Sequence, residues 1–343
     1  MKVLTVAAPG VLQVQEMPFP EPGPYDALCR TTYATICAGT DSHVIDGTFG
    51  PRRFPAVIGH ESIGEVIDVG ARVTMFRPGD LVTRVSIPPS ADGSYELAWR
   101  GMTEFAIARD HEALRLDGEP ESTWGPSRVN QVIRTRRLTG PQTPMFITWR
   151  ETYSYTRRLG VTAGSRVVVS GSGANGLSIA SMARVLGAAE IVVIGSASRI
   201  AAAHQAGGSL MIAYTDDTAV DRFVTEWRAS VDVLIDATGI SHSLDRLLPT
   251  IAPTGVVGVY GLDDAENYGI DPLRASSFRF LDPGYDEAEA HDAIEDAIEA
   301  GLLDPTVWID DTRLFGWAHL VDAYQAARDR SLIKPVIDMR SPL

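Results

Sequence analysis

The chain has 343 residues, enough for two domains that each bury a core. Hydrophobic residues make up 45% and charged residues 22%, which is typical of globular proteins. The 44 acidic residues outnumber the 30 lysines and arginines and give a net charge of −14, which argues against binding to nucleic acid or anionic membranes.

The same composition indicates a compartment. No apolar run reaches the roughly 18 residues of a membrane span, and the N-terminus "MKVLTVAAPG" lacks the apolar core of a signal peptide. The two cysteines, Cys29 and Cys37, are too few for a disulfide framework. We therefore expect a cytoplasmic protein with free thiols and no membrane partner.

The first 115 residues predict a compact antiparallel β domain. Runs rich in β-branched residues lie between glycines and prolines, at 26–36, 63–70 and 79–87. We place the first domain at residues 1–150.

From residue 166 the pattern alternates between strands and helices. Strands are predicted at 166–171, 189–195, 231–239 and 255–261, and helices at 174–187, 198–208 and 241–253. Such alternation predicts right-handed crossovers and a doubly wound parallel sheet, an α/β Rossmann domain at residues 151–285. The tail, 286–343, holds two helical patterns and a final strand. It is too short to fold alone, so we expect it to return to the first domain.

A glycine-rich turn, "GSGANG", joins the first of these strands to the first helix. Gly171, Gly173 and Gly176 have the spacing of a dinucleotide-binding turn, in which the glycines permit a tight turn, approach to a pyrophosphate and close packing. Together with Ala174 and Asn175 they are the candidate phosphate contacts.

The end of the second strand indicates which dinucleotide binds. NAD sites usually carry an acid there that holds the ribose 2′-hydroxyl, whereas this chain has Gly195, Ser196 and then Arg199. These residues accommodate a 2′-phosphate, so we predict NADP(H), with NAD the less favoured cofactor. Tyr214 is a candidate neighbour of the adenine, or else a half-buried surface aromatic.

Residues typical of a catalytic zinc site lie in the first domain. Cys37 opens "CAGTDSH", and His60 and Glu61 follow 23 residues later in "GHES". A thiolate, an imidazole and a carboxylate can bind one zinc ion and leave a position open, and zinc eases ionisation of an alcohol. Taken singly, each residue has an ordinary structural explanation.

The chain resembles a zinc-dependent alcohol dehydrogenase of the medium-chain dehydrogenase/reductase superfamily. The resemblance is carried by "CAGTDSH", "GHESIGEVIDVGARVTMFRPGDLV", "GMTEFAI", "GSGANGL", "DVLIDATG" and "LIKPVI". It is strongest to bacterial NADP-dependent secondary-alcohol, polyol and sugar dehydrogenases, and it implies a GroES-like catalytic domain before the Rossmann domain.

The resemblance also implies roles for individual residues. Cys37, His60 and Glu61 would bind zinc, and Asp41 would orient His60. Thr40 would take the alcohol proton, and His43 would pass it toward solvent.

The family's third zinc ligand has no clear match in this chain. Thr148 stands at its position, and a threonine hydroxyl binds zinc poorly. Either Glu61 completes the ligand set, or Glu151 does so from a shifted loop, or the zinc site is weakened.

Seven arginines between residues 128 and 158 reverse the local sign of charge. They form either an ordinary solvated or interface surface or a set of contacts to an anionic group on substrate or cofactor.

The sequence is compatible with three alternative functions. The first is zinc-dependent hydride transfer between NADP(H) and a secondary alcohol, polyol or sugar-like cyclitol, or the matching ketone. The second is a zinc-free reductase of quinones or activated C=C bonds, and the third is a non-catalytic nucleotide-binding protein. We expect a homodimer or homotetramer joined through a sheet edge near residues 255–264 or 276–282.

Overall fold

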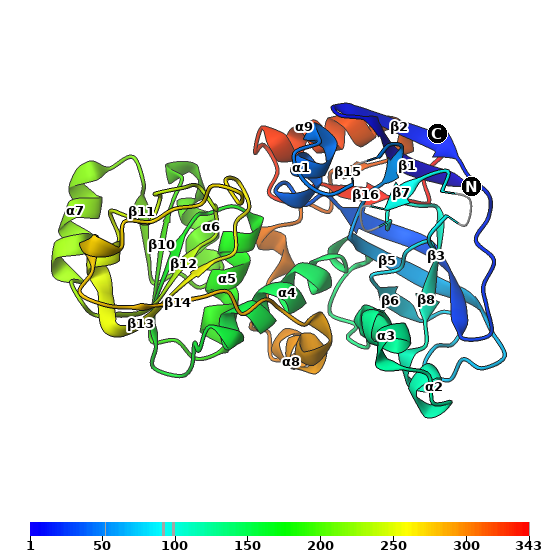
Figure 1. Cartoon of the computed structure of the whole chain (residues 1–343), viewed down its shortest axis with the longest axis horizontal. Helices are drawn as coiled ribbons and strands as arrows, with labels where there is room; N and C mark the ends of the chain where they lie inside the picture. The colour runs from blue at the N-terminus through cyan, green and yellow to red at the C-terminus, as the bar shows by residue number, and fades with distance from the viewer. Residues whose placement is uncertain (52, 91–92, 98–99, 343) are drawn as a thin grey trace. The chain divides into compact units, whose positions relative to one another are not determined.

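The computed structural model describes residues 1–51, 53–90, 93–97 and 100–342. These fold as two compact units (Figure 1). The first combines Met1–Ile147 with Trp308–Leu343, and the second is Thr148–Val307. Residues 286–307 therefore belong to the second unit, and the chain after them returns to the first.

The first unit is built on two sheets. Their strand orders are β2-β1-β4-β7 and β15-β16-β3-β5-β6, with β8 also paired to β3. The strands are β1 (Lys2–Ala8), β2 (Val11–Glu16), β3 (Asp26–Thr35), β4 (Ala56–Val57), β5 (Glu61–Val69), β6 (Leu81–Thr83), β7 (Glu96–Leu97), β8 (Phe105–Arg109), β15 (Leu314–Phe315) and β16 (Val336–Asp338). The predicted antiparallel pairing is confirmed where β3 meets β5, β8 and β16.

Short helices connect these strands. They are α1 (Thr40–Asp46), α2 (His111–Leu116), α3 (Glu121–Trp124) and α9 (Leu320–Arg328), with 3₁₀ turns η1 (Gly125–Val129), η2 (Gly140–Gln142) and η7 (Trp317–His319). The helix α4 (Met145–Arg158) runs across the boundary between the units.

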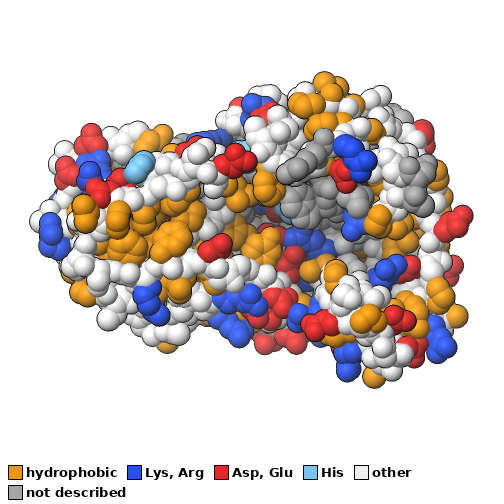
Figure 2. Space-filling view, in the orientation of Figure 1, with side chains coloured by type: hydrophobic (Ala, Val, Ile, Leu, Met, Phe, Trp, Pro, Cys, Tyr) orange, Lys and Arg blue, Asp and Glu red, His pale blue; other side chains and the backbone are white. Residues whose placement is uncertain are grey.

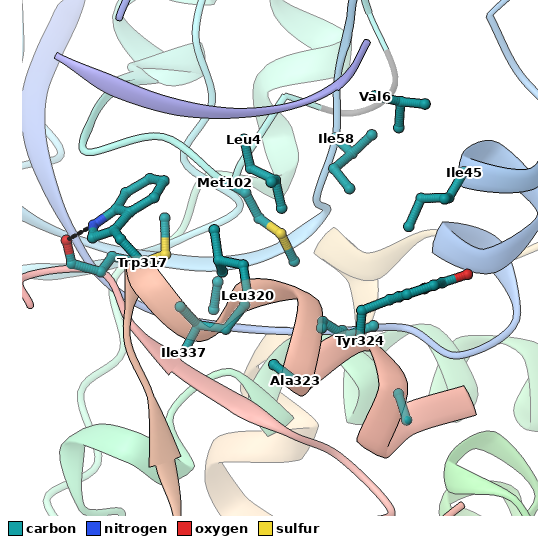
Figure 3. Packing of buried hydrophobic residues seen from close by; sticks show 14 of the residues in the cluster. Leu4, Val6, Ile45, Ile58, Met102, Trp317, Leu320, Ala323, Tyr324 and Ile337 are labelled. Carbon is teal, nitrogen blue, oxygen red and sulfur yellow. Dashed lines mark hydrogen bonds between the residues drawn. The ribbon is translucent and has the colours of Figure 1, made fainter. Parts of the chain in front are cut away.

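One apolar cluster joins the two ends of the chain within the first unit (Figure 3). Leu4 and Ile58 from the N-terminal part pack with Trp317, Leu320 and Tyr324 from the C-terminal part. Burial of such side chains is favourable by about 1.5–3 kcal/mol each. The C-terminal segment is therefore part of this core.

The second unit is a six-stranded parallel sheet in the order β11-β10-β9-β12-β13-β14. Its strands are β9 (Arg166–Ser170), β10 (Glu190–Gly195), β11 (Leu210–Ala213), β12 (Val231–Asp236), β13 (Ile251–Val259) and β14 (Arg279–Leu281). Its helices are α5 (Ala174–Val185), α6 (Ile200–Gln205), α7 (Asp217–Glu226) and α8 (Glu287–Glu299), with 3₁₀ turns η3 (Ala197–Arg199), η4 (Leu248–Thr250), η5 (Pro272–Arg274) and η6 (Pro305–Val307). This is the Rossmann strand order, so the predicted fold class is confirmed.

Two predictions for this sheet are wrong. Residues 241–247 form turns rather than the start of a helix, and only η4 is helical between β12 and β13. His242 takes a left-handed φ of 62°, and Pro249 has no N–H to donate, so a continuous helix does not form. Residues 255–259 are also no sheet edge, because β13 pairs with β12 on one side and β14 on the other.

Within the described ranges, no helix has the length and hydropathy needed to cross a membrane.

Asp110 shows how a buried acid holds a small helix in the first unit. Its carboxylate caps α2 by accepting from Ala113 N at 2.8 Å. It also accepts from Thr74 N and Met75 N, at 2.6 and 2.9 Å, and from Thr74 Oγ1 at 3.0 Å. Burial acts to raise the pKa of Asp110, but these hydrogen bonds outweigh it and lower the pKa below its usual 3.8.

Asp110→Ala is expected to lower the free energy of unfolding by about 2–3 kcal/mol at pH 7, because it removes a cap and leaves buried donors unsatisfied. Because the pKa of Asp110 is lower in the folded than in the unfolded protein, its carboxylate stabilises the fold at pH values above the unfolded-state pKa. That stabilisation is lost as the pH falls through the folded-state pKa. The difference in the free energy of unfolding between the variant and the wild type should therefore become smaller below about pH 4. Urea unfolding at pH 7 and pH 3 measures this.

Asp216→Ala is the matched control, because Asp216 caps α7 through the single N–H of Ala219. Its cost should be about 1 kcal/mol or less. Equal costs for the two variants, or a gap that does not narrow in acid, would contradict the role of Asp110.

Candidate metal centre and cofactor turn

Cys37 lies in the turn between β3 and α1. Its backbone N–H donates to Asp41 Oδ2 at 3.0 Å, and its carbonyl accepts from Asp41 N at 3.0 Å. These two bonds close the turn and bury both side chains. Asp41 therefore fixes the position from which the Cys37 thiol extends.

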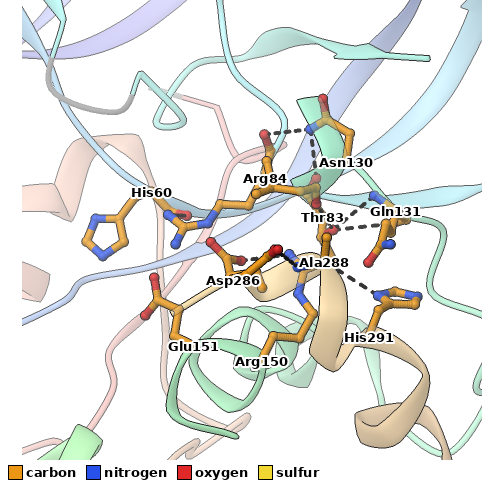
Figure 4. Close-up of polar contacts among 12 residues, drawn as sticks. His60, Thr83, Arg84, Asn130, Gln131, Arg150, Glu151, Asp286, Ala288 and His291 are labelled. Atoms are coloured by element: carbon orange, nitrogen blue, oxygen red, sulfur yellow. Dashed lines mark hydrogen bonds and ion pairs between the residues drawn. The ribbon is translucent and has the colours of Figure 1, made fainter. Parts of the chain in front are cut away.

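His60 and Glu61 lie where the chain enters β5. Gly59 just before them has φ +96°, and a Cβ there would lie 2.3 Å from Met102 Cγ, so only glycine fits. The carbonyl of His60 accepts from the Arg84 guanidinium at 2.6 Å, and Asn130 Nδ2 in turn donates to the Arg84 carbonyl at 3.0 Å (Figure 4). The segment is thus held from both sides.

Cys37, His60 and Glu61 form one buried group. Each offers a ligand atom, and these atoms all lie within 4.8 Å of one another. The Nδ1 of His60 lies 3.3 Å from Asp41 Oδ1, which leaves Nε2 as the nitrogen for a metal. A thiolate, an imidazole and a carboxylate are the donors that catalytic zinc sites use, so the group fits zinc.

Neighbouring charges set the protonation of this group. Burial acts to lower the pKa of His60, but Asp41 and then Cys37 outweigh it and raise the pKa well above 6.5. Burial acts to raise the pKa of Glu61, but the Lys334 ammonium outweighs it and, with smaller effects from His60 and Thr35, lowers the pKa to about 2. Both side chains therefore lie beside charges that offset the cost of burying them.

Lys334 and Thr35 are neighbours of the group that the sequence analysis missed. Lys334 Nζ, fully buried, forms an ion pair with Glu61 Oε1, and Thr35 Oγ1 donates to Glu61 Oε2 at 2.6 Å. The signal for Lys334 was present, because "LIKPVI" places a lysine inside an apolar run. No local pattern connects that run to Glu61.

Thr40 and His43 share one face of α1. Thr40 is its first residue, His43 follows three residues later, and both are partly exposed. His43 Nδ1 lies 2.9 Å from Thr48 Oγ1. The turn that holds Cys37 leads directly into this helix, since Asp41 belongs to both.

Glu151 and Thr148 lie in the second unit, both within α4. Both are buried. A carboxylate oxygen of Glu151 accepts from the Tyr260 phenol at 3.3 Å. The alternative in which Glu151 reaches zinc from a shifted loop is wrong about the loop, because Glu151 is a helical residue.

Two arginines of the predicted basic segment form ion pairs between α4 and α8. Arg150 is fully buried and donates to Glu287 at 2.8 Å, and Arg158 donates to Glu289 at 2.9 Å. These two arginines therefore have a structural role as ion-pair partners, and an anionic ligand is not needed to explain them.

The glycine turn has the geometry that its sequence predicts. It joins β9 to α5, and Gly171 has φ +116°. A Cβ on Gly176 would lie 2.1 Å from the Gly171 carbonyl, whereas a Cβ on Gly173 would meet no atom within 4 Å. Gly173, before Ala174 and Asn175 at the start of α5, thus leaves open space for a ligand, and α5 presents its first N–H groups beside it.

The residues predicted to select the cofactor lie at the carboxyl edge of the same sheet. Ser196 N donates to Ser172 Oγ at 2.9 Å, and Tyr214 N donates to the Gly195 carbonyl at 2.9 Å. Arg199 ends η3, three residues on. A Cβ on Gly195 would lie 2.3 Å from Ser172 Oγ, so close packing is a second reason for glycine at this position.

Two family models match the chain. The one described as "Alcohol dehydrogenase GroES-like domain" matches residues 23–117, and the one described as "Zinc-binding dehydrogenase" matches residues 174–281. The first range contains Cys37, His60 and Glu61. The second begins in the glycine turn and extends to β14.

Individual proteins agree with these matches. A sorbitol dehydrogenase from Ovis aries is 29% identical over 277 residues, 76% of this chain and 74% of that protein. An alcohol dehydrogenase from Cupriavidus necator is 30% identical over 287 residues, 77% and 78% of the two chains. The structure of benzyl alcohol dehydrogenase from Acinetobacter calcoaceticus has the same fold, with a TM-score of 0.79, 18% identity and 98% coverage of each chain. The chain therefore belongs to the zinc-type alcohol dehydrogenases of the medium-chain dehydrogenase/reductase superfamily.

Proposed function

We propose that this protein transfers a hydride between NADP(H) and a secondary alcohol, polyol or sugar-like cyclitol, or the matching ketone, with one zinc ion bound by Cys37, His60 and Glu61. The observation that carries the proposal is the convergence of these three side chains within 4.8 Å in a buried site. A polyol substrate is supported by the likeness to a sorbitol dehydrogenase.

The proposed roles follow from donor chemistry and position. Zinc bound there supplies Lewis acidity, which eases loss of the alcohol proton. Asp41 holds the His60 ring with Nε2 toward the site. The Thr40 hydroxyl oxygen would accept the alcohol proton as it releases its own proton, and His43, one helical turn along α1, would pass a proton on toward solvent.

NADP(H) is supported by the charges at the end of β10. Neither Gly195 nor Ser196 carries an acid that would repel a 2′-phosphate, and Arg199 supplies a cation nearby. Tyr214, 59% exposed beside Gly195, offers a surface for the adenine. The 171–176 turn takes the pyrophosphate.

A homodimer or homotetramer is the proposed assembly. Within the described chain β14 pairs on one side only, with β13, and its Phe280 is 48% exposed. Hydrophobic side chains also gather on the face of the second unit seen in Figure 2. A second copy pairing with β14 would cover this edge. Two free cysteines suit a cytoplasmic location.

Cys37→Ser is expected to reduce bound zinc from about one per chain to a small fraction of that, and to abolish turnover, because a hydroxyl is a poor substitute for a thiolate. NADPH affinity should change less than about twofold, since the glycine turn is untouched. Metal analysis and NADPH fluorescence titration measure both.

Cys29→Ser is the control, because Cys29 is equally buried in β3 but lies outside the metal group. It should retain zinc. Full zinc and activity in Cys37→Ser would reject the metal assignment, and a wild type without zinc would favour the zinc-free reductase.

Lys334→Met is expected to destabilise the metal-free protein by about 3–5 kcal/mol, because it leaves the buried Glu61 carboxylate without its ion-pair partner. Zinc restores a positive charge beside Glu61, so the loss should be much smaller in the zinc-loaded protein. Thermal unfolding with chelator and with zinc compares the two states. Lys2→Met, which removes a partly buried pair with Glu104, should cost the same in both. An equal loss for Lys334→Met in both states would argue against Glu61 as a ligand.

The cofactor proposal is tested by placing an acid at residue 195. Because a side chain there meets Ser172, the variant is Ser172→Gly with Gly195→Asp. We expect its preference, measured as the ratio of kcat/KM for NADP to that for NAD, to fall about 10- to 100-fold through repulsion of the 2′-phosphate. Ser172→Gly alone is the control. An unchanged ratio would mean that NADP is not the cofactor.

A further inference from the structure

A single buried carboxylate, that of Asp236 at the end of β12, organises the carboxyl edge of the sheet. Its Oδ1 accepts from Thr238 N at 2.8 Å, Thr238 Oγ1 at 2.6 Å and Gly239 N at 3.1 Å. Its Oδ2 accepts from Ser243 Oγ at 2.8 Å and Tyr268 Oη at 3.0 Å. Five donors thus converge on one side chain that has no exposed surface.

These donors come from two different loops. The β12 loop is residues 237–247 and the β13 loop is residues 260–269. The Asp236 carbonyl adds a second link, because it accepts from Tyr260 N at 2.8 Å and Gly261 N at 3.2 Å. The loops also touch backbone to backbone, since a Cβ on Gly239 would lie 2.3 Å from the Gly261 carbonyl carbon.

The Asp236 carboxylate binds the segment that the sequence predicts to be the crossover helix between β12 and β13. A helix satisfies most of its backbone groups within itself. The β12 loop instead consists of turns up to η4, so its shape depends on side-chain bonds. Burial and the Asp236 charge both raise the pKa of Tyr268, which keeps its phenol a hydrogen-bond donor at neutral pH.

The β12 loop borders the glycine turn. Ala237 N donates to the Ser170 carbonyl at 2.8 Å, and a Cβ on Gly171 would lie 3.0 Å from Thr238 Cγ2. A doubly wound sheet binds one mononucleotide on each half, outside the carboxyl ends of its strands. The half with β9, β10 and β11 carries the phosphate turn and the residues proposed for the adenosine. We therefore expect the nicotinamide mononucleotide to bind at the half with β12 and β13.

We propose that Asp236 is a positioning residue for the nicotinamide half of the cofactor, which it controls by holding the β12 and β13 loops together through Ser243 and Tyr268. This rests on the proposed use of a nicotinamide cofactor. The adenosine half lies against other strands and does not depend on Asp236.

The test compares a whole cofactor with a fragment that fills only the adenosine half. NADPH and 2′,5′-ADP are titrated into the full-length wild type, Tyr268→Phe, and Tyr268→Phe with Ser243→Ala. We expect the Kd of NADPH to rise about 3-fold in the single variant and about 10-fold in the double variant, which loses both partners of Oδ2. The Kd of 2′,5′-ADP should stay within 2-fold of wild type. Asp236→Asn, which keeps the shape of the side chain, should behave like the double variant.

Asp216→Ala controls for general loss of stability in the same unit, and should leave both constants unchanged. If NADPH and 2′,5′-ADP weaken together, or neither weakens, the positioning role is overturned while the proposed function stands. If the wild type binds 2′,5′-ADP and NADPH with no measurable affinity, and NADH likewise, both the proposed function and this inference are overturned.

Discussion

The first unit is organised around the need to neutralise buried acidic groups. Glu61 and Asp41 lie beside the Cys37 thiol with almost no exposed surface, where Lys334 pairs with Glu61 and His60 faces Asp41. Burying an ion costs several kcal/mol unless an opposite charge and hydrogen bonds compensate it. A divalent cation held by the thiolate, imidazole and carboxylate meets this need, and it explains why these donors converge although hydrophobic packing alone does not require them.

Other features of the unit follow from that constraint. The left-handed Gly59 and the Arg84 guanidinium on the His60 carbonyl fix the segment that supplies two of the three donors. The C-terminal segment packs into the same core and brings Lys334 to Glu61. A chain that ended before residue 308 would lose both that core and the charge balance of the site.

The sequence predicted well what local rules determine. Runs of apolar and β-branched residues located the long central strands β3, β5, β9, β10, β12 and β13. The spacing of Gly171, Gly173 and Gly176 predicted a turn whose geometry the structure reproduces, because it depends on a few neighbouring residues. Contacts between distant side chains were not predictable in this way. Lys334 with Glu61, and Tyr268 with Asp236, pair groups 273 and 32 residues apart, and no local period encodes them. The helix predicted at 241–253 is missing for a related reason, since the left-handed φ of His242 and the bond from Ser243 to Asp236, which the hydrophobic pattern does not reveal, accompany turns at 241–247.

The most direct test of the account is the zinc-edge X-ray absorption spectrum of the metal-replete protein. We predict one zinc per chain with a single sulfur at about 2.3 Å and the remaining ligands nitrogen or oxygen at about 2.0–2.2 Å, as one cysteine, one histidine and one glutamate require. A shell of oxygen and nitrogen alone, or no bound metal, would contradict the assignment of Cys37, His60 and Glu61 as a zinc site.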